Sequence, residues 1–138
     1  KKKKKAKKTA VGLFLPEFKM KNFKLKKLMD TNDEWIRTRT GISERRILKD
    51  PDKTTAFMGA EAAKKTLPNA NVDASKIDLV ILATVTPDYL FPATACLVQN
   101  MIGATNAFAF DLSAACSGFL YALSTGSMYI EAGRAKKC

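Results

Sequence analysis

The chain has 138 residues, of which 46% are hydrophobic and 27% charged, as in a folded globular domain or part of one. That composition excludes a wholly disordered chain, and no apolar run approaches the ~20 residues that a membrane-spanning helix needs. Histidine is absent, which excludes histidine-ligated metal sites and any Ser-His or Cys-His pair formed within the chain.

Positive charge is concentrated at the start of the chain. There are 24 Lys and Arg against 13 Asp and Glu, a formal net charge of +11, and seven of the lysines lie in residues 1–8. We expect these residues to form a solvated, mobile tail, because a block of like charges repels itself and buries nothing. A tether to nucleic acid or to an anionic surface is the alternative, but no aromatic residues are interleaved with the lysines to stack on bases.

The first part of the chain predicts short elements. Residues 9–16 (TAVGLFLP) are typical of a short buried strand that ends at a proline. We expect a short helix over residues 23–29 and a second helix that begins near Asn32 and ends at Gly41. Residues 42–48 alternate in part and are a candidate strand.

The rest of the chain alternates between helices and strands. The predicted elements are a helix over residues 55–67 that Pro68 ends, a strand over 77–85, a loop over 86–92, a helix over 94–101 that Gly103 ends, a strand over 106–113 and a helix over 116–133. The strand over 77–85 is nearly all apolar, which favours a central parallel strand covered on both faces. This alternation predicts an α/β fold with a mostly parallel sheet. The chain stops at a helix exit with no following strand, so we expect a sequence that is cut off.

The segment FDLSAACSGFLYAL (residues 110–123) carries the strongest chemical signal. A buried strand runs through small residues into Cys116 and then into a very apolar helix. The start of a helix favours an anion, so we expect a stabilised, nucleophilic thiolate at Cys116, with its backbone N–H as an oxyanion donor. An inert core cysteine is the alternative. Cys96 is interpreted as a core residue, and Cys138 is given no role.

The cysteines match no metal or redox motif. Their spacing excludes CxxC patterns, so we expect a reducing compartment and no metal site.

Three long segments together resemble the β-ketoacyl-acyl carrier protein synthase III family of thiolase-fold condensing enzymes. They are DTNDEWIRTRTGISERRI (30–47), LATVTPDYLFPATACLVQNMIGA (82–104) and AFDLSAACSGFLYALS (109–124). The similarity extends over residues 11–134. It implies a layered, thiolase-like α/β/α fold in which residues 9–138 form the N-terminal half-repeat, after the tail.

The resemblance implies a two-stage acyl transfer. Cys116 would take an acyl group, commonly acetyl, from an acyl-coenzyme A, and would then pass it to the carbanion formed by decarboxylation of malonyl-acyl carrier protein. The product would be a 3-oxoacyl-acyl carrier protein, the first step of fatty-acid elongation. No cofactor is implied beyond the coenzyme A thioester, which is a substrate.

The resemblance also implies binding residues. Trp35 matches a tryptophan that stacks on the coenzyme's adenine, and Thr31 and Arg39 fall on positions that contact the coenzyme. Phe91 matches a residue that reaches across a homodimer interface into the partner's acyl pocket. The alternatives are a core residue for Trp35, a surface ion pair for Arg39 and an ordinary interface or core aromatic for Phe91.

The chain departs from the family in lacking the histidine and the asparagine that complete its active site, both of which come from the second half. We therefore expect a fragment that is inactive alone. Two alternatives are a non-catalytic basic module that binds nucleic acid or acidic carrier protein, and a stand-alone half that pairs with a separate chain. Neither nucleic acid nor a membrane is the expected partner. The expected location is the cytoplasm, or a plastid if the source is eukaryotic.

Overall fold

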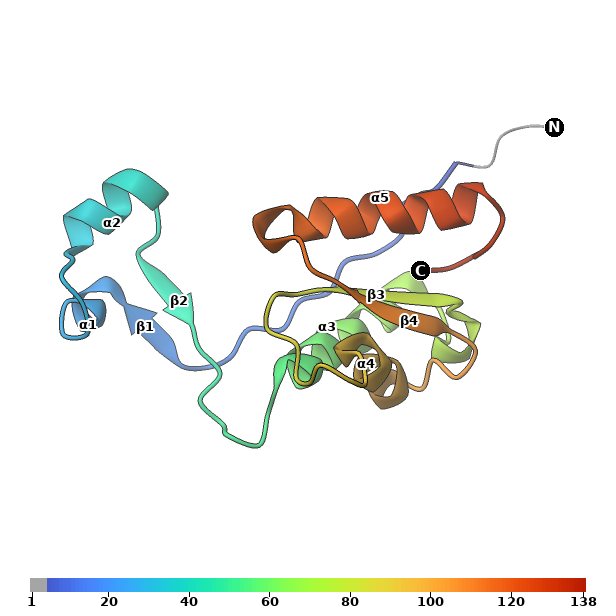
Figure 1. The fold of residues 1–138 in the computed structure, drawn as a ribbon, viewed down its shortest axis with the longest axis horizontal. Coiled ribbons are helices and arrows are strands. Elements are labelled where there is room, and N and C mark those ends of the chain that lie inside the picture. The colour runs from blue at the N-terminus through green and yellow to red at the C-terminus, as the bar shows by residue number, and fades with distance from the viewer. Residues whose placement is uncertain (1–4) are drawn as a thin grey trace. The chain divides into compact units, whose positions relative to one another are not determined.

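The computed structural model describes residues 5–138, which form two compact units (Figure 1). The larger unit holds residues 53–138 together with the described residues up to Phe14, and the smaller unit is Leu15–Asp52. The expected tail falls partly on residues 1–4, which lie outside the described residues, and residues 5–8 carry no helix or strand.

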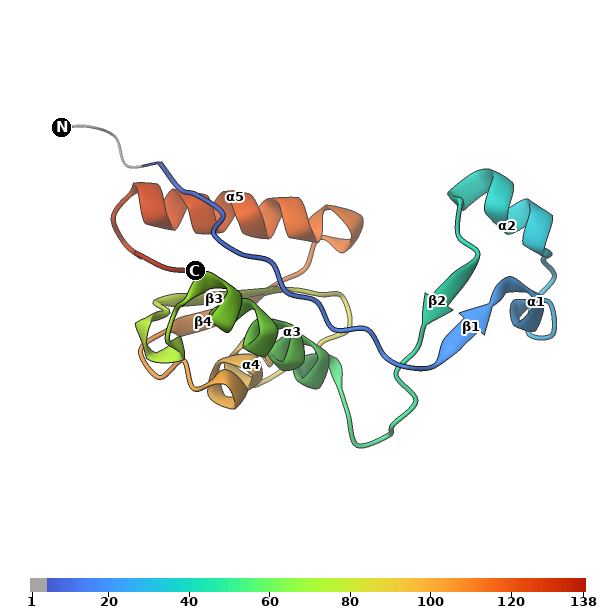
Figure 2. The ribbon, with the colours of Figure 1, turned by 180° about the vertical axis from the view of Figure 1, so that it is seen from behind.

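The larger unit has three layers, helices on sheet on helix. Strand β3 (Leu79–Ala83) pairs in parallel with β4 (Phe108–Leu112). Helices α3 (Thr55–Ala70) and α4 (Thr94–Ile102) cover one face of this pair, and α5 (Gly118–Glu131) covers the other (Figures 1 and 2). The expected parallel pairing, with helices on both faces, is confirmed.

Alternation along β3 explains how both faces are covered. A Cβ placed on Gly126 of α5 would lie 3.8 Å from the Ile81 side chain, and one on Gly59 of α3 would lie 3.4 Å from Leu82. Neighbouring residues of a strand point to opposite faces, so Ile81 meets α5 and Leu82 meets α3. Leu79, at the start of the strand, is fully buried.

The prediction of a buried strand over residues 9–16 is wrong. This segment is extended but joins no sheet, and Val11 and Leu13 are 63% and 59% exposed. Its alternate residues pack on α3 instead of on a strand edge: Phe14 meets the Phe57 ring edge-on at 5.5 Å, and a Cβ on Gly12 would collide with helix atoms. Within residues 5–138, β3 consequently has β4 as its one neighbour and is not central.

The prediction that Pro68 ends its helix is also wrong. Helix α3 continues to Ala70 and ends at Asn71, which adopts the left-handed conformation with φ 51°. In that conformation the Asn71 N–H donates to the Pro68 carbonyl at 2.9 Å, and the Val72 N–H donates to the Leu67 carbonyl at 3.0 Å. The last carbonyls of α3, those of Leu67 and Pro68, therefore have hydrogen-bond partners, and the helix tolerates Pro68 in its last turn.

The smaller unit is built around a buried asparagine. It contains β1 (Lys19–Lys21), α1 (Asn22–Leu25), α2 (Asp33–Thr40) and β2 (Glu44–Arg46), with β1 and β2 antiparallel. The Asn22 side chain is 1% exposed and donates to Asp33 at 2.7 Å and to the Ile42 carbonyl at 2.8 Å, while Arg45 donates to it at 2.8 Å. One side chain therefore ties α1 to the start of α2 and to β2.

Helix α2 begins and ends where its sequence predicts. Asn32 accepts a hydrogen bond from the Trp35 N–H at 2.8 Å, and Gly41 closes the helix with φ 71°. Both positions are typical caps, since the Asn side chain satisfies a free amide and glycine tolerates the left-handed conformation. The hydrogen bond from Asn22 and the ion pair with Arg37 hold the pKa of Asp33 below its usual value.

The C-terminal segment is tied to the strand layer by Asp78. Its carboxylate accepts from the Lys136 and Lys137 N–H groups at 2.7 and 3.0 Å, which lower its pKa below the usual 3.8. The lowered pKa means that these hydrogen bonds stabilise the folded state. That stabilisation is fully present above pH 3.8 and is lost as the pH falls through the lowered pKa of Asp78. These two hydrogen bonds of Asp78, which we call the tether, place the Cys138 sulfur close to α5, 3.0 Å from where a Cβ on Gly126 would lie. Burial raises the pKa of the Cys138 thiol.

We expect Asp78→Ala to release residues 134–138 and to accelerate alkylation of Cys138 by about three- to tenfold, because solvation favours the thiolate. Peptide mass spectrometry after timed iodoacetamide treatment measures this rate. Asp73→Ala, which removes another carboxylate bonded to a backbone N–H, is the control. If iodoacetamide alkylates Cys138 at the same rate in Asp78→Ala as in the unaltered protein, then Asp78 does not hold the C-terminal segment in place.

Helix α5 leaves much apolar surface uncovered in this structure. Phe119, Leu120 and Tyr121 are 70%, 64% and 57% exposed, and Met128 is 66% exposed. Exposed apolar surface of this extent is typical of an interface. Among the helices of residues 5–138, none combines the length and hydropathy of a membrane-spanning segment.

Candidate functional site

Cys116 lies in a tight turn between β4 and α5. The chain leaves β4 at Leu112, and a 3₁₀ turn over Ala115–Ser117 leads directly into α5. Ala115 has φ +44°, a left-handed conformation that is rare for a residue with a Cβ and that marks a site held in place by its surroundings. The thiol is exposed, as a nucleophile must be.

The start of α5 has no internal anion to match its positive end. No side chain caps it, and its first turn contains no acidic residue. A negative charge placed there is stabilised by the helix dipole. Gly118 permits the close packing of this turn, since a Cβ there would lie 3.1 Å from that of Ala83 at the end of β3. The expectation that Cys116 lies at a helix N-terminus is confirmed.

A half-buried carboxylate connects β4 to the start of α4. The two oxygens of Asp111 accept from the Thr94 and Ala95 N–H groups at 2.8 and 2.7 Å. Thr94 and Ala95 are both 0% exposed. The carboxylate therefore supplies the acceptors that the first turn of α4 lacks, and it fixes this helix to the strand that leads to Cys116.

The same connection continues into the loop over residues 84–93. The Asp88 N–H donates to the Thr94 hydroxyl at 2.8 Å, and the Asp88 carboxylate accepts from the Thr54 hydroxyl at 2.6 Å and from the Ala56 N–H at 3.2 Å. The Asp88 carboxylate thus caps α3, while the Asp88 backbone N–H is held by α4. The base of the loop is fixed at two helix starts.

The tip of this loop is apolar and open to solvent. Tyr89, Leu90 and Phe91 are 60%, 102% and 90% exposed. An apolar tip on a fixed base is typical of a contact with another protein or with a ligand. The structure therefore leaves Phe91 available for such a contact and does not pack it into a core.

The other three predicted residues lie together in the smaller unit. The Arg39 guanidinium stacks on the Trp35 ring at 4.5 Å from its centroid, and Trp35 is 51% exposed. The alternative of a core tryptophan is therefore wrong. The Thr31 hydroxyl oxygen is buried without a hydrogen-bond partner, which is unusual and is costly unless a ligand or water satisfies it.

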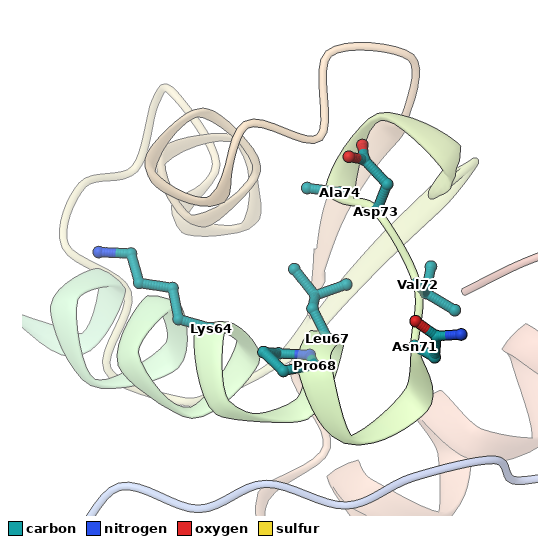
Figure 3. Close-up of a pocket in the computed structure, with 7 residues that line it drawn as sticks. All are labelled: Lys64, Leu67, Pro68, Asn71, Val72, Asp73 and Ala74. Carbon is teal, nitrogen blue, oxygen red and sulfur yellow. The ribbon is translucent and has the colours of Figure 1, made fainter.

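A hollow of about 590 Å³ lies at the far edge of the sheet (Figure 3). It is lined by residues at the end of α3 and the start of the next turn, among them Lys64, Pro68 and Asp73. That turn precedes β3, whereas Cys116 follows β4. Because the two strands are parallel, the hollow and the thiol lie at opposite edges of the sheet.

Sequence reasoning missed the polar residues that support these sites. Asp111 is the one charged residue in an otherwise apolar strand, which is a signal for a buried partner, but Asp88, in a loop, and Asn22, in a lysine-rich segment, carry no such signal. The sequence predicts a core position for Cys96, but this residue is only half-buried and donates weakly to the Ala109 carbonyl at 3.7 Å. Within residues 5–138, no group of three or more metal-ligating side chains converges.

Known proteins resemble this chain along nearly all of its length. The family of 3-oxoacyl-[acyl-carrier-protein (ACP)] synthase III matches residues 110–138. β-Ketoacyl-[acyl-carrier-protein] synthase III of Chlorobium phaeovibrioides is 59% identical over 129 residues, covering 94% of this chain and 39% of the relative. The corresponding protein of Aquifex aeolicus is 52% identical over 91% of this chain and 40% of its own length. The chain spans about two fifths of the length of these curated relatives.

Solved structures give the same result. The synthase III of Aquifex aeolicus superimposes with a TM-score of 0.86 at 50% identity, over 92% of this chain and 41% of that one. The synthase III of Thermus thermophilus superimposes with a TM-score of 0.81 at 44% identity, over 91% of this chain and 39% of that one. The expected thiolase-like α/β fold is confirmed by these superpositions.

Proposed function

Because the chain is 59% identical to a β-ketoacyl-[acyl-carrier-protein] synthase III over 94% of its own length, we propose that it belongs to this family and supplies the acyl-accepting thiol and part of the coenzyme A site of such a synthase. The observation that carries the proposal is the exposed Cys116 in a strained turn at the uncapped start of α5. That position combines access, the positive end of a helix dipole and a nearby backbone donor.

The first half-reaction forms a thioester on Cys116. The thiolate attacks the carbonyl carbon of an acyl-coenzyme A, commonly acetyl, and the carbonyl electrons move to oxygen. We assign the oxyanion donor to the Cys116 N–H, because the Ser117 and Gly118 N–H groups already donate to the Ala114 and Ala115 carbonyls. Collapse of the adduct breaks the bond to the coenzyme sulfur and releases coenzyme A.

The second half-reaction forms the new carbon–carbon bond. A malonyl-acyl carrier protein loses CO₂, and the electron pair of the broken bond becomes a carbanion that attacks the acyl group on Cys116. The Cys116 thiolate leaves, and a 3-oxoacyl-acyl carrier protein two carbons longer remains. The family's histidine and asparagine promote these steps, and residues 1–138 contain no histidine, so in this proposal that group comes from outside them. The proposed reaction uses no resident cofactor.

The cluster of Thr31, Trp35 and Arg39 supports coenzyme binding. Trp35 offers an aromatic face for adenine, Arg39 is suited to a phosphate or to stacking, and the unpartnered Thr31 hydroxyl offers a hydrogen bond. We propose a homodimer to which Phe91 contributes, consistent with its exposure at the tip of an anchored loop. The proposed location is the cytoplasm.

Acylation by acetyl-coenzyme A alone tests this function. We expect one acetyl group per chain on the peptide that contains Cys116, located by mass spectrometry, when the protein is assembled with the residues that complete its active site. Acetylation of Cys96 at an equal rate, or no acetylation of Cys116, would contradict the proposal.

We expect Trp35→Ala to weaken coenzyme A binding by about 10- to 100-fold, since stacking of a base on an aromatic ring contributes about 1–3 kcal/mol. Isothermal titration with coenzyme A measures the affinity. Trp35→Phe retains a ring and is expected to lose less. If Trp35→Ala and the unaltered protein bind coenzyme A equally well, the Trp35 ring does not contact the coenzyme and has a structural role only.

A further inference from the structure

The segment around α1 carries positive charge that its own unit does not neutralise. Lys19 pairs with Glu44 at 3.2 Å, but within the described part of the chain no ion pair reaches Lys21, Lys24, Lys26 or Lys27. Three of these, Lys24, Lys26 and Lys27, are exposed and occur within four residues. We call these three residues the lysine turn.

The backbone brings two of these charges onto one side. The Lys27 N–H donates to the Lys24 carbonyl at 3.2 Å, a bond between residues three apart. Side chains three residues apart are eclipsed in a turn of this type. Lys24 and Lys27 therefore project in similar directions.

The ammonium group of Lys49 lies close to that of Lys24 in the lysine turn. Lys24 and Lys49 lie 5.0 and 3.5 Å from the centroid of the same ring, that of Phe18. Both charges are thus closer together than the screening length of about 10 Å at 0.1 M salt. Their repulsion is relieved when an anionic group approaches.

Apolar side chains are exposed beside the lysines. Phe23, Leu28 and Met29 are 58%, 70% and 57% exposed. A surface of mixed charge and apolar character is complementary to a protein face that is both acidic and apolar. Helix α1 has only four residues, which is too short to lay an extended apolar face on a lipid surface.

The lysine turn directly precedes the proposed coenzyme site. Thr31 follows Lys27 by four residues, and α1 contacts α2, which carries Trp35 and Arg39. Coenzyme A and acyl carrier protein present their thioesters on the same phosphopantetheine arm. A carrier protein whose arm enters where the coenzyme binds must therefore rest on the surface beside Thr31.

We propose that the lysine turn is a docking surface for the acidic face of acyl carrier protein. This inference rests on the proposed function, because that function identifies the carrier as a substrate. Lys24, Lys26 and Lys27 pair with carboxylates of the carrier, and the exposed Phe23 and Leu28 contact its apolar residues.

The test uses the whole chain and an apo acyl carrier protein, which lacks the phosphopantetheine arm and so reports docking alone. The variant Lys24→Glu/Lys26→Glu/Lys27→Glu is expected to weaken binding about tenfold at about 50 mM salt, and the loss should shrink as salt rises. Fluorescence anisotropy of the labelled carrier measures the affinity. Circular dichroism verifies that the variant is folded.

The matched control makes the same charge change in the larger unit, as Lys65→Glu/Lys76→Glu/Lys136→Glu, and is expected to bind like the unaltered chain. An equal loss in both variants would overturn the proposal in favour of a general effect of net charge. Tighter binding to phosphatidylglycerol vesicles or to single-stranded DNA than to the carrier would overturn it as well. Acetylation of Cys116 by acetyl-coenzyme A needs no carrier. If Cys116 is not acetylated, the proposed function is refuted, but anisotropy would still detect binding of the carrier to the lysine turn.

Discussion

Cys116→Ser is expected to reduce acylation of the assembled protein by more than about 10³-fold. In the proposed reaction the Cys116 thiolate is the attacking group, and a serine hydroxyl at the same place remains protonated at neutral pH without a base beside it. The change removes no large side chain and leaves the exposed turn between β4 and α5 intact. Transfer of labelled acetyl from acetyl-coenzyme A measures the rate.

The other two cysteines provide matched controls. Cys96→Ser alters a half-buried thiol that bonds to the Ala109 carbonyl, and Cys138→Ser alters a thiol whose pKa is raised by burial. Neither is expected to change the acylation rate by more than about twofold. Full activity of Cys116→Ser would show that the nucleophile lies elsewhere, and full loss in Cys96→Ser would show that the fold, not the thiol, was damaged.

Asp111→Ala is expected to lower the free energy of unfolding by about 3 kcal/mol. The change leaves the Thr94 and Ala95 N–H groups at the start of α4 without acceptors, in a place where both residues are inaccessible to water. An unsatisfied buried donor costs about 1–3 kcal/mol, and hydrogen bonds to a charged group are at the upper end of the range. Urea unfolding followed by circular dichroism measures the change.

Asp73→Ala is the control for Asp111→Ala. Asp73 bonds to Ser75 at an exposed turn, so its loss is expected to cost about 0.5–1 kcal/mol. Because Asp111 also fixes the strand that leads to Cys116, its replacement should slow acylation in the folded protein, whereas Asp73→Ala should not. Equal destabilisation by the two variants would contradict the role assigned to Asp111.

Elements with strong local signals could be predicted from the sequence. Asn32 and Gly41 bound α2 because an amide cap and a left-handed glycine act within a few residues. The apolar strands β3 and β4, and the position of Cys116 before α5, follow from patterns of the same short range. The candidate site was predictable to this extent, because a nucleophile at a helix start is a local arrangement.

Elements that depend on distant partners could not be predicted. Residues 9–16 have the composition of a strand, yet they lie against α3, since Gly12 and Phe14 fit that helix and no strand edge. Asp88 and Asp111 acquire their roles only when α3, α4 and β4 converge at one place. The hydrogen bonds of Asn22 likewise join residues up to 23 positions apart.

The amino-acid sequence by itself determined the resemblance to the family, the alternation of helices and strands from α3 to α5, and the cysteine at the start of α5, because capping, periodicity and composition act over a few residues. Only the tertiary structure decided that Cys116 and Phe91 are open to solvent, that Thr31 has an unsatisfied hydroxyl, and that the Asp88 and Asp111 carboxylates accept from the first amides of α3 and α4. Exposure and hydrogen-bond partners depend on which segments pack together, and that packing is a property of the whole fold.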